Sequence, residues 1–147
     1  MPNGRIEALA DGVFAIAMTL LAFNLQVPSN SIKDNGDLHA ALLEMLPSLK
    51  TYMLSFLVIG IYWISHHFQF HYVHHANRTL LWINFFFLMA VATLPFSTAV
   101  LGRYEHYRSA IVLYSANLLL VGLLNAIHWA YVTHRRRLVA PDLPDEI

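Results

Sequence analysis

The sequence predicts an all-α membrane protein with four transmembrane helices per chain. Of its 147 residues, 57% are hydrophobic and only 12% are charged, whereas soluble domains carry roughly a quarter of charged residues. The charges are also segregated, because Asp, Glu, Lys and Arg do not occur in residues 12–32, 51–77, 79–102 and 109–133. A helix needs about 20 apolar residues to cross a hydrocarbon core roughly 30 Å thick, so each of these stretches is long enough to span it.

The first two predicted helices are separated by a polar loop. The first runs over about 4–27 and ends before Pro28, where Asn, Ser and Gly indicate an exposed turn. The second covers about 48–70. It follows Pro47, which we expect to kink or break the chain, and an amphipathic segment, 39–46, which we expect to lie at the membrane interface.

The third and fourth predicted helices cover about 78–101 and about 108–133. Pro95 lies inside the third, and this predicts a bend close to it, because neighbouring groups can occupy a carbonyl that proline leaves free. Residues 1–134 are thus expected to form one transmembrane channel domain, and residues 135–147 a basic and then flexible cytoplasmic tail.

The distribution of Lys and Arg predicts that both termini are cytoplasmic. This orientation puts Arg5, Arg78, Arg135, Arg136 and Arg137 inside, and Lys33, Arg103 and Arg108 outside. The first apolar run lacks a small-residue cleavage site, so we do not expect it to be a signal peptide. The chain has no cysteine and a formal net charge of zero, which argues against thiolate chemistry, disulfides and nucleic-acid binding.

Helical spacing divides the first helix into three rows of side chains. The small row contains Ala8, Gly12, Ala15, Thr19 and Ala22. The large row contains Leu9, Val13, Ile16, Leu20, Phe23 and Val27. The Asp11 row contains Asp11, Phe14, Met18, Leu21 and Leu25. Helices associate in lipid through small residues, so the small row packs either against the same chain or against other copies, with the large row then facing a shared axis.

Asp11 is an ionisable residue inside an apolar helix, about 9 Å beyond Arg5 at 1.5 Å per residue. One interpretation is a carboxylate favoured by the dipole at the helix N-terminus. The other is a buried network that joins Asp11 to Arg5 and to groups on the second and third helices. The candidates at the same end of the bundle are Trp63, His66, His67, Arg78 and Asn84.

Residues 66–75 hold five histidines: His66, His67, His71, His74 and His75. On a continuous helix, His67, His71 and His74 would share a face, which suits a transition metal or haem. The spacing is also similar to the histidine boxes of membrane desaturases, but the remaining histidines are scattered. We therefore favour an interfacial basic loop for His71, His74 and His75, no metal site, and a structural role for His66 or His67.

The chain resembles the family of the lysosomal potassium channel called transmembrane protein 175 and its bacterial homologues. The family motif on the first helix is Arg, three residues, then Phe-Ser-Asp, and "RIEALADGVFAIAMTLL" matches it at Arg5 and Asp11. The other matching features are Trp63 with His66 and His67, Asn84, and the pair Pro95-Phe96. Two features depart from the pattern: Leu9 and Ala10 replace Phe-Ser, and bacterial subunits of the family usually have six crossings where four are predicted here.

The resemblance implies a homotetramer in which first helices surround an ion pathway that lacks a carbonyl-lined filter. By position after the Asp, the pore constriction falls on Ile16, Leu20 and Phe23, and a hydroxyl layer for ion preference falls on Thr19. The residues of the structural network would be Arg5, Asp11, Trp63, His66, His67 and Asn84. Aliphatic rings of this kind can gate by dewetting.

These observations predict a potassium-preferring cation channel in a cell membrane, a bacterial inner membrane by the resemblance. The expected partners are further copies of the chain, membrane lipid and potassium ions as the permeant species; no enzyme activity, cofactor or nucleic acid is expected. Two alternatives stay open at this point: a histidine-rich membrane protein that binds a metal or haem for redox chemistry, and a four-helix chain that assembles without conducting.

Overall fold

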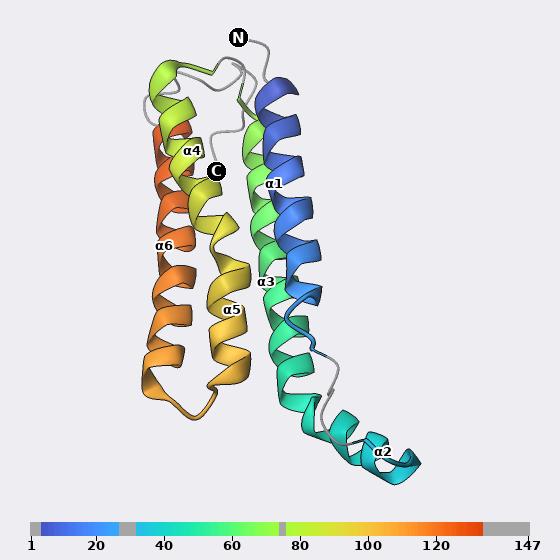
Figure 1. The fold of residues 1–147 in the computed structure, drawn as a ribbon. Coiled ribbons are helices and arrows are strands. Elements are labelled where there is room, and N and C mark those ends of the chain that lie inside the picture. Colours follow the sequence, from blue (N-terminus) through green and yellow to red (C-terminus); the bar gives the residue numbers. More distant parts are fainter. Residues whose placement is uncertain (1–3, 27–31, 74–75, 134–147) are drawn as a thin grey trace.

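The computed structural model describes residues 4–26, 32–73 and 76–133, which fold into an elongated helical bundle (Figure 1). The helices, in chain order, are α1 (Gly4–Ala22), α2 (Asn35–Glu44), α3 (Leu46–His71), α4 (Arg78–Ala92), α5 (Leu94–Arg103) and α6 (Arg108–Thr133). α5 continues from the end of α4, so the two form one broken helix, and the bundle consists of α1, α3, the α4–α5 pair and α6 (Figure 1). The short α2 projects from one end.

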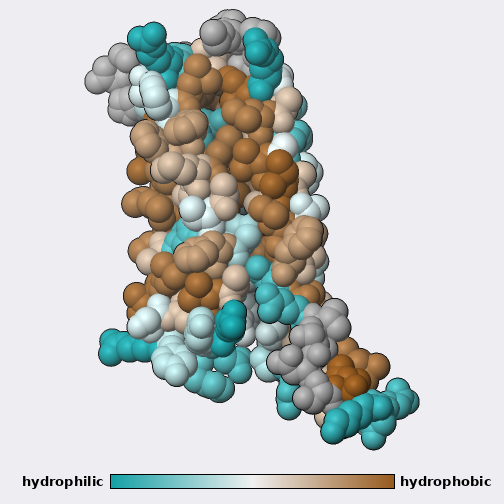
Figure 2. Space-filling model, viewed as in Figure 1, coloured by the Kyte–Doolittle hydropathy of each residue, from teal (hydrophilic) through white to brown (hydrophobic). Residues whose placement is uncertain are grey.

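Three segments of the described residues are long and apolar enough to cross a membrane: Leu46–His71, Arg78–Arg103 and Arg108–Thr133. On the face seen in Figure 2, brown apolar side chains cover most of the middle of the bundle, and teal hydrophilic ones gather at both ends. α1 is not one of these segments, because its 19 residues include three charged ones, Arg5, Glu7 and Asp11. It nevertheless lies along α3 (Figure 1). An all-helical architecture with three candidate membrane spans is therefore confirmed, and a crossing by α1 stays a prediction.

The first helix ends at Ala22, five residues before the predicted limit, and Val27 lies outside the described residues. Beyond Ala22 the backbone N–H groups of Phe23 and Asn24 donate to carbonyls three residues earlier, at 3.2 and 3.1 Å, which forms tight turns. The Asn24 side chain then donates to the carbonyl of Pro95 at 3.0 Å. This hydrogen bond joins the residues that follow α1 to the first turn of α5.

The bend expected close to Pro95 is a break at Thr93, between α4 and α5. Pro95 occupies the first turn of α5, where a missing N–H costs little. Backbone N–H groups at the Thr93 cap donate to the carbonyls of Ala90 and Val91, and the Thr93 hydroxyl donates to Ala90 at 2.8 Å. The polar groups near the proline are thus paired inside the protein, as a membrane requires.

The amphipathic segment before the second predicted helix forms α2, which begins earlier than expected. The side chain of Asp34 caps it by accepting from the backbone N–H of Asp37 at 2.9 Å. Met45 separates α2 from α3, and Pro47 lies in the first turn of α3. None of the α2 residues is buried, which fits a segment at the membrane surface.

Apolar side chains from α1, α3, α4, α5 and α6 meet in one core. Its largest fully buried members are Phe14, Phe87, Leu21, Ile59 and Leu94. Hydrogen bonds join the helices beside this core: the Thr98 hydroxyl donates to Ser55 at 3.0 Å, and the Tyr62 hydroxyl donates to the carbonyl of Leu118 at 3.1 Å. Close packing and interhelical hydrogen bonds of this kind hold helices together where no hydrophobic force acts between them.

Candidate functional site

α1 buries one face against its own chain and exposes the remainder. Its buried residues are Ile6, Ala10, Phe14, Ala17 and Leu21. They lie on the side that contacts α3, α4 and α5. Phe14 and Leu21 come from the Asp11 row, so this row supplies part of the packing face, while Asp11 itself lies at its exposed edge.

The small row does not pack against the other described residues of the chain. All five of its residues are exposed, and a Cβ atom added to Gly12 would meet no atom within 4 Å. The interpretation that this row packs on the other helices of the same chain is wrong, because α1 is rotated so that Ala10, Phe14 and Ala17 fill that interface. The interpretation that it contacts other copies stays a prediction.

The three residues expected to form a constriction all project from the chain. Ile16 is 60% exposed, Leu20 43% and Phe23 79%. Ile16 and Leu20 lie one turn apart on α1, and Phe23 lies in the turn that follows the helix. They form an unpartnered apolar strip beside the small row.

Thr19 lies on α1 at the border between the small row and this strip, and it is exposed. Its hydroxyl donates to the carbonyl of Ile16 at 2.9 Å. Because the hydroxyl hydrogen is held by the backbone, the lone pairs of the oxygen are left to point away from the helix. The residue can therefore offer an oxygen ligand to a cation.

The predicted network separates into two parts. In the first, the Trp63 indole N–H donates to the Asp11 carboxylate at 2.8 Å, which joins α3 to α1. The Trp63 ring also stacks on His67, with centroids 5.8 Å apart. Arg5 is exposed and forms no hydrogen bond or ion pair with the described residues, so the structure of the single chain does not join it to Asp11.

The second part is a buried centre around His66, where helices α1, α3, α4 and α6 meet. The His66 ring is 2.8 Å from the side-chain oxygen of Asn84 on α4. It stacks on Phe87 at 5.1 Å and contacts Phe14 of α1 at 6.0 Å, between ring centroids. His66 and Asn84 are thus brought together, apart from the exposed pair of Asp11 and Trp63.

Sequence reasoning missed two members of this centre, Gln69 and His128. Nδ1 of His128 on α6 lies 2.6 Å from the side-chain oxygen of Gln69 on α3, and the His128 ring lies 5.5 Å from His66. In the sequence, Gln69 is an amide among apolar residues at the end of the second predicted helix. Its partner could not be predicted, because the sequence does not show that α6 faces it.

The histidines do not form a metal site within the described residues. α3 ends at His71, so the continuous helix that would align His67, His71 and His74 stops before the last of them, and His74 and His75 lie outside the described residues. No group of three or more His, Cys, Asp or Glu side chains in the described part of the chain could hold a metal ion.

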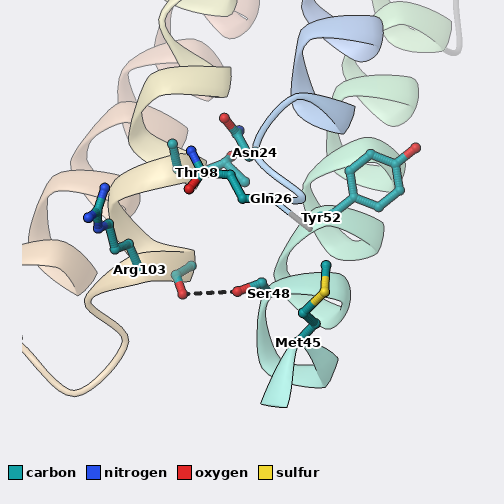
Figure 3. A pocket seen from close by; sticks show the side chains of 9 residues that line it. Asn24, Gln26, Met45, Ser48, Tyr52, Thr98 and Arg103 are labelled. Carbon is teal, nitrogen blue, oxygen red and sulfur yellow. Dashed lines mark hydrogen bonds between the residues drawn. The ribbon is translucent and has the colours of Figure 1, made fainter. Parts of the chain in front are cut away.

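Two hollows flank α1. A groove of about 510 Å³ between α1 and α3 is lined by Asp11, Phe14, Ala15, Met18, Gly60, Trp63 and Ile64. At the opposite end of α1, a polar pocket of about 280 Å³ lies between the end of that helix, α3 and α5 (Figure 3). Its lining includes Asn24 and Gln26, and the Ser48 hydroxyl closes one side by donating to the carbonyl of Gly102 at 3.3 Å.

The sequence and the fold of this chain are similar to those of known proteins. Residues 5–95 match the family described as the endosomal/lysosomal potassium channel TMEM175. A protein of Streptomyces collinus named as a potassium channel is 39% identical over an alignment of 145 residues, and the match covers 95% of this chain and 68% of that protein. The chain belongs to the TMEM175 family.

Two further TMEM175 comparisons come from Chamaesiphon minutus. A protein named as a potassium channel is 35% identical over 94% of this chain and 70% of its own length. The crystal structure of a lysosomal potassium-selective channel TMEM175 homolog superposes with a TM-score of 0.83 at 34% identity, over 91% of this chain and 73% of that one. The TMEM175 fold thus extends through α6, beyond the residues that the family match covers.

Proposed function

We propose that this chain is a subunit of a potassium channel in which α1 helices from four copies surround the ion pathway. The observation that carries the proposal is that α1 buries only one face in its own chain and leaves both the small row and the apolar strip exposed. Membership of the TMEM175 family, whose bacterial relatives carry the name potassium channel, supports the choice of ion.

In this arrangement the small row of one α1 contacts the neighbouring copy, because small residues allow helices to approach closely in lipid. The groove at Asp11, Ala15 and Trp63 then receives side chains of that copy. The apolar strip of Ile16, Leu20 and Phe23 faces the axis as a hydrophobic constriction. Potassium is the permeant species, and no cofactor is required for passage.

The proposed conduction mechanism is dewetting. A ring of aliphatic side chains excludes water when narrow, and a small dilation lets water and a partly hydrated cation enter. Thr19 lies one turn from Ile16 and supplies hydroxyl oxygens next to the constriction. Two groups of residues would hold α1 at the rotation that keeps the apolar strip on the axis: Asp11 with Trp63 and His67, and His66 with Asn84. Arg5 would complete this network by a contact between copies.

The proposed location is the bacterial cell membrane with the N-terminus and the end of α6 inside. α1 and α4, whose first turns contain Arg5 and Arg78, begin at one end of the bundle, whereas α3 and α6 begin and α5 ends at the other (Figure 1). Counted from the sequence, Arg5, Arg78 and the run 135–137 on the proposed cytoplasmic side outnumber Lys33, Lys50, Arg103 and Arg108 on the other, which supports this orientation.

Ion flux in liposomes tests this function. Replacing an apolar ring by amides should wet the constriction, so Ile16→Asn should raise potassium flux by about tenfold, which corresponds to a barrier lowered by roughly 1.4 kcal/mol. The matched control is Leu113→Asn, an exposed position on α6. Absence of potassium flux from both the wild type and Ile16→Asn would contradict the proposal, as would an equal rise in the control.

A further inference from the structure

The turn that follows α1 is tied to another helix by the side chain of Asn24. α1 ends at Ala22, and Phe23 and Asn24 lie in the turns beyond it. The Asn24 amide donates to the carbonyl of Pro95, in the first turn of α5, at 3.0 Å. Phe23 comes directly before Asn24 and is exposed. The hydrogen bond therefore fixes the backbone from which Phe23 projects.

The acceptor of this hydrogen bond belongs to a well-anchored part of the bundle. Pro95 and Ser97 are buried. The amide of Asn117 on α6 donates to the Ser97 hydroxyl at 3.0 Å, and its side-chain oxygen lies 3.2 Å from the Thr93 hydroxyl. A carbonyl oxygen has two lone pairs, so that of Pro95 can accept from Asn24 and also within α5. The break between α4 and α5 is thus joined both to α6 and to the turn after α1.

Close packing does not hold this turn on the side of the polar pocket. There Asn24 and Gln26 border the volume of about 280 Å³, and the remaining lining comes from Met45, α3 and α5 (Figure 3). Gln26 makes no hydrogen bond to the described residues. Of the described residues 23–26, Asn24 alone makes a hydrogen bond to another described helix. The pocket leaves the turn room to move, so this hydrogen bond decides where the turn lies.

We propose that Asn24 is a positioning residue for the end of the constriction at Phe23. By binding the break between α4 and α5, it holds Phe23 toward the ion pathway. This role rests on the proposed function, in which α1 helices of several copies line that pathway. Ile16 lies about two turns earlier on α1, where the buried Phe14 and Ala17 hold the helix against the other helices. Loss of the hydrogen bond should therefore move Phe23 and leave Ile16 in place.

Cadmium block of potassium flux in liposomes tests the proposal, because Cd²⁺ binds tightly where thiols from several copies converge. Phe23→Cys and Ile16→Cys are each compared with and without Asn24→Leu, which keeps the size of the side chain and removes the amide. In Phe23→Cys, Asn24→Leu should raise the Cd²⁺ concentration for half block by about fivefold, equivalent to one hydrogen bond of about 1 kcal/mol. In Ile16→Cys, it should leave that concentration unchanged.

Gln26→Leu is the matched control, because it removes an amide that lines the same pocket, and it should leave the block of both cysteine variants unchanged. If Asn24→Leu does not fold, Asn24→Ala repeats the test with a smaller change to the polar pocket. Equal shifts in Phe23→Cys and Ile16→Cys would overturn the proposal, because Asn24 would then hold the fold in general.

An unchanged block of Phe23→Cys in Asn24→Leu, or a shift as large in Gln26→Leu, would also overturn it. So would block of Ile16→Cys without block of Phe23→Cys when Asn24 is present, and in that case the proposed function stands. Failure of the proposed function has a separate signature. Cd²⁺ then blocks neither cysteine variant when Asn24 is present, and the role of Asn24 falls with it.

Discussion

Substitution of Thr19 can separate the proposed preference for potassium from the proposed constriction. Its hydroxyl is already bonded to the carbonyl of Ile16, so its substitution by valine removes the oxygen and retains the shape of the side chain. The apolar strip of Ile16, Leu20 and Phe23 is left in place. The contribution that we propose for the hydroxyl can therefore be tested separately from the proposed constriction.

We expect Thr19→Val to retain potassium flux and to lower the preference for potassium over sodium by roughly fivefold, the ratio for about 1 kcal/mol of lost oxygen–cation interaction. Flux of each ion into liposomes measures this ratio. Thr51→Val is the matched control, because the Thr51 hydroxyl also bonds to its own helix, at the carbonyl of Pro47. A ratio that stays at the wild-type value in Thr19→Val argues against a hydroxyl layer.

Individual residues also show how far sequence reasoning extends. One of the two interpretations of Asp11 joins it to Arg5 and to groups on the second and third helices, and the structure shows one such partner, Trp63 on the second. The division into an exposed pair and a buried centre around His66 was not predictable. It depends on which side of α3 faces α1, and adjacent residues on a helix point about 100° apart.

At the scale of elements, α1 differs from the other helices in what it leaves unpaired. Its small row lies in a continuous line along the helix, and none of the residues that the structure describes covers it. Helical spacing identified the row, but not whether the same chain or another copy packs against it. The outcome depends on the rotation of α1, which Phe14 sets by filling the core between α3 and α4.

Gly12→Leu tests the small row as a contact between copies. A Cβ atom added at Gly12 meets no atom of the described residues within 4 Å, so we expect the helix content and the fold of the single chain to be unchanged while the oligomer dissociates. Size-exclusion chromatography with light scattering measures the mass. Ala130→Leu, an exposed small residue of α6, should leave the oligomer intact, and an unchanged mass in Gly12→Leu would contradict the assignment.

The broken α4–α5 helix illustrates a feature that sequence does predict. A proline inside an apolar run predicts a bend, and the structure has a break at Thr93, two residues before Pro95. The contact that follows the end of α1 was missed because its partner is distant in the sequence. Asn24 donates to the carbonyl of Pro95, 71 residues away, and such a pairing is not visible in local composition.

At the scale of the whole molecule, charge segregation and hydropathy were sufficient to predict an all-helical membrane protein. The bounds of the last helix, Arg108–Thr133, also agree with the sequence. Assembly is a different matter, because the number of copies and the axis they share depend on surfaces between chains. We propose that the α1 helices of several copies meet around one potassium pathway.

The most direct test of that claim uses the absence of natural cysteines from the chain. In Ile16→Cys, thiols from neighbouring copies would converge on the axis and bind a soft metal ion, so micromolar Cd²⁺ should block potassium flux in liposomes and a chelator should restore it. Leu113→Cys on the exposed side of α6 should be insensitive. Potassium flux through Ile16→Cys that persists in Cd²⁺, or equal block of both variants, would contradict a pathway lined by α1.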